Sequence, residues 1–70
     1  MGNQTLARFS INREFFDIVG CWDKDTPDNQ FDFYDIYDEG GICLNEGCPF
    51  YTFPSWFELK EYLEENYFEK

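Results

Sequence analysis

The sequence lacks histidine and has few basic residues, and these absences narrow the chemistry that it can support. Its 70 residues include no His and five Lys or Arg against 15 Asp or Glu, so the formal net charge at pH 7 is −10. A charge of this sign repels nucleic-acid phosphates and anionic lipid headgroups. We therefore expect the protein to bind neither nucleic acid nor a membrane directly.

Long apolar runs are also missing. No stretch approaches the roughly 20 apolar residues of a membrane span, and residues 1–5 have neither the basic start nor the apolar segment of a secretory signal. The three cysteines, Cys21, Cys43 and Cys48, are an odd number, which fits poorly with the disulfide framework of a small secreted domain. These features favour a cytoplasmic protein with reduced thiols.

The chain lacks the residue patterns of catalysis. Without histidine, Ser10 and Ser55 have no recognisable general base, and acids near each cysteine raise the thiol pKa instead of favouring the reactive thiolate. Paired carboxylates need a closed cleft to act as acid and base, and a domain of this size buries only about 60% of its unfolded surface. We predict a non-enzymatic protein with no catalytic residue.

Metal and cofactor sites are not expected either. Three cysteines without histidine fall short of the four ligands of a structural zinc site. Asp23, Asp25 and Asp28 share one loop, as calcium ligands do. However, counting from Asp23, an EF-hand needs an acid at position five, a glycine at six and a glutamate at twelve, where this chain has Pro27, Asp28 and Tyr34. The sequence therefore predicts no metal and no cofactor.

Aromatic residues, in contrast, are abundant: nine Phe, five Tyr and two Trp. Acidic disordered chains are poor in such residues, and each buried ring removes about 150–250 Å² from water. We therefore expect one folded domain over residues 1–70, with residues 1–5 frayed because they are polar and show no periodicity.

Alternating polarity and strand-favouring residues predict an antiparallel sheet, and residues 12–14 are compatible with a hairpin, a bulge or the start of a helical turn. A solvated loop is expected at 23–30 and a tight turn at 38–41, because both are rich in turn-forming residues. The strands are expected at 6–12, 15–22, 31–37 and 42–45, with 50–53 as a short edge piece.

A helix from Trp56 to Tyr67 is the sharpest local prediction, since Ser55 and Glu58 have the spacing of a capping box. One helix face has an apolar stripe and another has acids. The stripe consists of Trp56, Leu59, Leu63 and Tyr67, and the acidic face of Glu58, Glu61 and Glu65. The expected fold class is α+β, a small antiparallel sheet of three to four strands with one C-terminal helix packed across it.

The remaining candidate site is the acidic surface, because carboxylates held in rows on a strand or a helix can imitate a phosphate backbone. Aromatic residues exceed what one small core can hide, so some should lie at the surface as contact residues; the candidates include Phe33, Tyr51 and Tyr62. The residues predicted to contact a partner are Asp23, Asp25, Asp28, Asp32, Asp35, Asp38, Glu39, Glu58, Glu61, Glu65, Tyr34 and Tyr37.

These observations favour a non-enzymatic protein that binds a basic, nucleic-acid-processing protein and inhibits it by occupying its nucleic-acid groove. In size and charge the chain is similar to the small acidic anti-restriction and anti-CRISPR proteins of bacteriophages and mobile elements. Two alternatives remain open. One is an accessory or immunity-type module that recognises its partner through an aromatic surface or a sheet edge. The other is a small-ligand or nucleotide sequestering protein, which the five basic residues support poorly.

Overall fold

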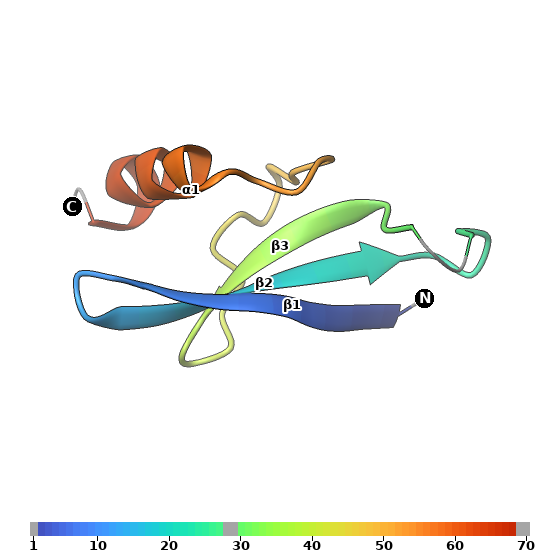
Figure 1. The fold of residues 1–70 in the computed structure, drawn as a ribbon, viewed down its shortest axis with the longest axis horizontal. Helices are drawn as coiled ribbons and strands as arrows, with labels where there is room; N and C mark the ends of the chain where they lie inside the picture. The colour runs from blue at the N-terminus through green and yellow to red at the C-terminus, as the bar shows by residue number, and fades with distance from the viewer. Residues whose placement is uncertain (1, 28–29, 69–70) are drawn as a thin grey trace.

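The computed structural model describes residues 2–27 and 30–68 and shows a three-stranded antiparallel sheet with a helix over one face (Figure 1). The strand order is β1-β2-β3, and the expected α+β fold is confirmed. The elements are β1 (Gly2–Ile11), β2 (Glu14–Trp22), β3 (Phe33–Asp38), α1 (Trp56–Leu63) and a π-helical turn, η1 (Glu64–Phe68).

The junction between β1 and β2 is a two-residue hairpin, which decides between the three conformations compatible with residues 12–14. Asn12 and Arg13 both have positive φ angles, 53° and 70°, and Ile11 pairs with Glu14 across the turn. Two consecutive left-handed residues give the turn whose twist matches that of the flanking strands. Asn tolerates this conformation well, whereas Arg13 adopts it because the paired strands on either side require it.

The first strand begins at Gly2, so the expectation that residues 1–5 fray is wrong for residues 2–5; Met1 lies outside the described residues. Gly2 pairs with Trp22, and a Cβ atom at Gly2 would lie 2.5 Å from the indole ring. The ring therefore packs directly against the backbone of the first strand. A bulge between Thr5 and Ala7 shifts the register, which explains why the alternating pattern did not extend to the N-terminus.

The core lies between the sheet and α1. Figure 1 shows α1 over one face of the sheet. The buried residues of the core are Ile11, Phe16, Ile18, Ile36, Leu59 and Leu63. The predicted helix stripe is correct for Leu59 and Leu63, but Trp56 is exposed and only meets the edge of Phe9, at a centroid distance of 5.7 Å. After Leu63 the chain widens into η1, which places Tyr67 against Phe16 at 5.6 Å.

Neither residues 42–45 nor residues 50–53 form a strand. Each segment has one isolated bridge to β3, Tyr37 with Cys43 and Tyr34 with Phe50. The side chain of Asn45 replaces a backbone partner here, because its Oδ1 accepts a hydrogen bond from the Ile36 N–H at 2.9 Å. The described part of the sheet therefore has three strands, and a buried amide side chain satisfies part of the β3 edge.

Candidate protein-binding surface

The loop before β3 carries the first group of predicted contact acids. Asp32 is used within the loop, since its Oδ2 accepts hydrogen bonds from Thr26 Oγ1 at 2.6 Å and from the Asp23 N–H at 2.8 Å. Asp23 and Asp25 are exposed, and Asp28 lies outside the described residues. The structure therefore leaves the Asp23 and Asp25 carboxylates at the surface and gives Asp32 a structural role.

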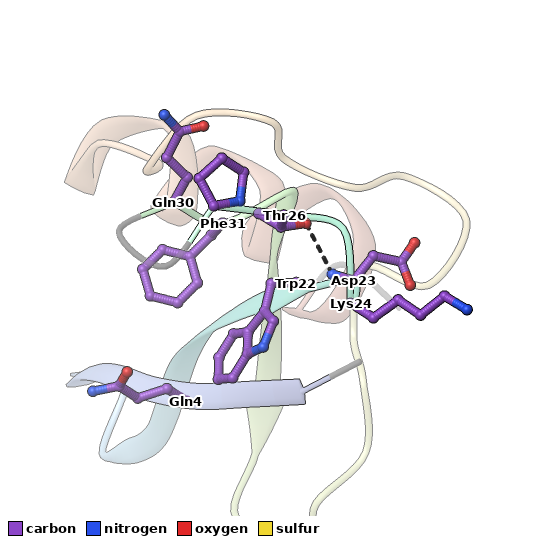
Figure 2. A pocket seen from close by; sticks show the side chains of 8 residues that line it. Gln4, Trp22, Asp23, Lys24, Thr26, Gln30 and Phe31 are labelled. Atoms are coloured by element: carbon purple, nitrogen blue, oxygen red, sulfur yellow. Dashed lines mark hydrogen bonds between the residues drawn. The ribbon is translucent and has the colours of Figure 1, made fainter.

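A recess of about 300 Å³ opens beside this loop, lined by residues of β1, β2 and the loop itself (Figure 2). The rings of Trp22 and Phe31 lie in it with their centroids 5.8 Å apart. Lys24 is the one basic residue that lines the recess, and Figure 2 shows its side chain directed away from both rings. A phosphate on a base stacked here would lack a cation, so the recess does not favour the nucleotide-sequestering alternative.

The aspartates predicted along β3 do not share a face. Asp32 precedes the strand, and Asp35 and Asp38 project to opposite faces because side chains alternate along a strand. The Asp38 Oδ1 accepts hydrogen bonds from two backbone N–H groups of the following turn, at 2.9 and 3.0 Å. Asp35 lies beside the Cys21 thiol, 3.6 Å from its Sγ. The structure thus does not bring these three carboxylates into one row.

The two predicted contact tyrosines are half-buried and also lie on opposite faces of β3. Tyr34 packs between Phe31 and Phe53, at centroid distances of 5.8 and 5.6 Å, on the face that α1 covers. Tyr37 lies on the other face, where burial and then the charge of Asp35 raise the pKa of its phenol. Tyr34 is therefore mainly a packing residue, whereas Tyr37 is part of the open sheet face.

The helix acids do gather on one exposed face. Glu58, Glu61 and Glu65 line a shallow hollow of about 250 Å³ together with Phe50 and Tyr62. One oxygen of Glu58 accepts the N-cap backbone N–H at 3.0 Å, which completes the predicted capping box and leaves the negative charge at the surface. This hollow, which we call the acidic helix face, combines three carboxylates with two aromatic rings.

An exposed aromatic segment, residues 51–57, leads into the same helix. Tyr51, Phe53, Trp56 and Phe57 are 74%, 52%, 54% and 73% exposed. The buried Pro54 holds the segment on the core. Concentrated apolar exposure of this kind marks an interaction site more often than it serves stability.

Tyr51 is one of the surface candidates predicted from the sequence, whereas the exposure of Phe53, Trp56 and Phe57 was not predicted. Periodicity assigned Trp56 to the core, because its spacing from Leu59 fits the buried stripe. The available signal was density: four aromatic residues within seven positions exceed what the first turn of one short helix can bury.

Few of the acids are neutralised by the protein's own cations. In residues 2–27 and 30–68, the one salt bridge joins Arg8 to Asp17, with Nε–Oδ1 and Nη2–Oδ2 distances of 2.8 and 3.3 Å. The hydrogen bond and charge of Arg8 lower the pKa of Asp17. Glu39 is exposed just after β3. The acidic helix face has no salt bridge within this part of the chain, so its charge is available to a partner.

Two of the three thiols, those of Cys21 and Cys43, are poorly suited to nucleophilic chemistry. Burial, followed by the charge of Asp35, raises the pKa of Cys21 to about 11, and the same causes raise the pKa of Cys43. A thiol with a raised pKa supplies little reactive thiolate near neutral pH. Within the described residues, no group of three or more His, Cys, Asp or Glu side chains is placed to hold a metal ion.

No helix within the described ranges combines the length and the apolar character needed to cross a membrane. Comparisons of the chain with protein-family models, with curated proteins and with solved structures found no match. The acidic helix face and the aromatic segment are the surface features with the most distinctive chemistry in the described chain.

Proposed function

We propose that this protein is a non-enzymatic, cytoplasmic inhibitor that binds the basic groove of a nucleic-acid-processing protein and excludes the nucleic acid. The observation that carries the proposal is the acidic helix face, where Glu58, Glu61 and Glu65 lie exposed along one hollow. Residues three or four apart on a helix have Cβ atoms about 5–6 Å apart. The three carboxylates present a compact, ordered array of negative charge to a groove built for phosphates.

The aromatic rings beside these charges support the same function. Phe50 and Tyr62 lie in the hollow, and Phe57 is exposed in the first turn of the helix. Grooves that bind single-stranded nucleic acid combine basic residues for the backbone with apolar surfaces on which bases stack. A ligand that offers carboxylates and rings together can engage both parts of such a groove.

Inhibition by this route needs binding and no chemistry. The net charge of −10 attracts the protein to a basic groove over a distance of about the Debye length, which is about 8 Å at physiological salt. Electrostatic steering accelerates association, and the aromatic contacts slow dissociation. In size and charge, though in no sequence motif, this action is similar to that of the anti-restriction and anti-CRISPR proteins of bacteriophages and mobile elements.

The direct test removes charge from the acidic helix face and keeps the helix. A variant with Glu58→Gln, Glu61→Gln and Glu65→Gln retains the capping box, because Gln also serves at the third helical position. The tagged protein captures its partner from nuclease-treated lysate, and competition with labelled nucleic acid is then measured over a salt series. We expect the wild type to displace the nucleic acid, and the variant to bind at least tenfold more weakly with a flatter salt dependence.

A control variant removes the same number of charges elsewhere, through Asp23→Asn, Asp25→Asn and Glu39→Gln. These three acids are also predicted contact residues, but they lie outside the hollow, so this variant should retain most of the affinity if the acidic helix face carries the binding. Equal loss in both variants would mean that overall charge, and not this face, drives binding. A captured protein without a nucleic-acid site would refute the proposal.

The alternative function is recognition of one partner through an aromatic surface or a sheet edge. The exposure of Tyr51 and Phe57 favours recognition through an aromatic surface. Recognition through a sheet edge is also possible, because the outer edge of β1 has no neighbouring strand in the described sheet. This alternative predicts binding that persists at several hundred millimolar salt and is lost when Tyr51 and Phe57 are changed to alanine. The salt series above therefore distinguishes the two functions.

A further inference from the structure

A separate hollow of about 330 Å³ lies where β3 meets the segment between β3 and α1. Phe33 and Asp35 line it from β3, on the sheet face opposite α1. The other wall comes from the connecting segment. The full lining consists of Phe33, Asp35, Cys43, Asn45, Glu46, Gly47, Pro49 and Tyr51.

The lining combines two carboxylates with two aromatic rings. Asp35 is half-buried, and Glu46 is exposed at the rim. Phe33 and Tyr51 supply apolar ring surface, and Tyr51 is 74% exposed. Two carboxylates repel an anionic ligand, and an apolar ligand would bury their charges without a partner, which costs free energy. The lining therefore favours a cation that can also contact aromatic rings.

Asp35 has neutral neighbours, the Cys21 thiol and the Tyr37 phenol, but no cationic partner within the described residues. Its Oδ2 lies 3.6 Å from the Cys21 thiol, which is a weak donor, and no salt bridge within the described residues involves Asp35. A half-buried carboxylate that has neutral donors and no cation beside it gains from a charged partner. The negative charge of Asp35 also contributes to raising the pKa of the Cys21 and Cys43 thiols, as expected for a carboxylate that no cation neutralises.

The wall of the hollow is held in place by Asn45. Its Nδ2 donates to the Tyr34 carbonyl at 3.1 Å and its Oδ1 accepts from the Ile36 N–H, so the side chain links the connecting segment to β3. A wall already fixed in the unbound protein loses little conformational entropy when a ligand binds.

We infer that this hollow binds the guanidinium side chain of an arginine presented by the partner. A guanidinium group is planar, stacks on aromatic rings and pairs with carboxylates through two parallel hydrogen bonds. The ammonium group of lysine is a more strongly hydrated point charge that gains less from a ring-lined hollow. The inference deepens the proposed function and rests on it for the source of the arginine, because a basic nucleic-acid groove is rich in this residue.

The test uses an arginine probe and therefore does not depend on identifying the partner. N-acetylarginine methylamide is titrated into ¹⁵N-labelled protein, and amide shifts are followed by NMR. We expect saturable shifts at Phe33, Asp35, Glu46 and Tyr51. The citrulline analogue has nearly the same shape but no charge, and it should produce no saturable shift.

Two variants test the carboxylates. Asp35→Asn and Glu46→Gln should each weaken probe binding about tenfold, as expected for loss of a hydrogen bond between charged groups. Glu46 is an exposed rim residue, so its variant should keep the wild-type spectrum even if Asp35→Asn disturbs the sheet. Glu64→Gln, a matched exposed acid on the other side of the molecule's core, should leave the affinity unchanged.

Titration of the corresponding lysine derivative, N-acetyllysine methylamide, completes the comparison. Three results would overturn the inference: no saturable shift with the arginine probe, equal shifts with citrulline, or an equal affinity for the lysine derivative. The outcome is separate from that of the proposed function. If the arginine probe binds but no nucleic-acid-processing partner is found, the hollow stands and the proposed function fails. If the partner binds through the acidic helix face and the arginine probe does not bind, the proposed function stands and the inference about the hollow fails.

Discussion

Replacing Asn45 with alanine tests the side-chain packing that takes the place of a fourth strand. Asn45 is 1% exposed, and its amide bonds to the Ile36 N–H at 2.9 Å and to the Tyr34 carbonyl at 3.1 Å. Each such hydrogen bond contributes about 1 kcal/mol to the free energy of unfolding. A buried backbone group that is left without a partner lowers it by about 1–3 kcal/mol. The Tyr34 carbonyl retains a bond from the Phe50 N–H at 3.4 Å, so the main loss falls on Ile36. We expect the free energy of unfolding to fall by about 2–4 kcal/mol.

That loss is a large fraction of the total free energy of unfolding, which is about 0.05–0.15 kcal/mol per residue in proteins. The assay is urea unfolding followed by tryptophan fluorescence and far-UV circular dichroism. Asn66→Ala is the matched control, since the Asn66 amide also donates to one backbone carbonyl, that of Tyr62 at 3.0 Å, but is exposed. It should change stability by less than about 0.5 kcal/mol. An Asn45→Ala protein as stable as this control would mean that the Asn45 side chain does not stabilise the β3 edge.

Four further predictions concern packing, capping and the thiols. Gly20→Ala places a Cβ atom 2.5 Å from the Phe31 ring and should lower the free energy of unfolding by about 1–3 kcal/mol in the same urea assay; an unchanged midpoint would contradict the contact. Ser55→Ala removes the helix cap and should destabilise the protein by about 1 kcal/mol, with a measurable loss of helical circular dichroism. Iodoacetamide at pH 8 should modify the exposed Cys48 first and the buried Cys21 last, as mass spectrometry would show. Because the pKa of Cys21 is raised from 9.0 to about 11, its burial should stabilise the fold fully below pH 9 and progressively less as the pH rises towards 11.

The candidate site was only partly predictable from sequence. The acidic helix face followed from the spacing of Glu58, Glu61 and Glu65, because residues three and four apart on a helix are neighbours whatever the rest of the chain does. The expected row on β3 failed on simple geometry, since residues three apart on a strand face opposite ways. The uses of Asp32 and Asp38 as local hydrogen-bond acceptors depend on loop conformations that a residue pattern does not specify.

Local periodicity and capping chemistry were enough to determine the α+β class, the start of the helix at Trp56 and the burial of Leu59 and Leu63. These properties depend on interactions between residues close in sequence, and so a single sequence contains them. Tertiary structure alone decided how far each surface is covered. It left Trp56 exposed because the helix packs on the sheet through its later turns, and it replaced a fourth strand with the side chain of Asn45. Burial depends on which distant segments meet, and short-range pattern carries no information about that.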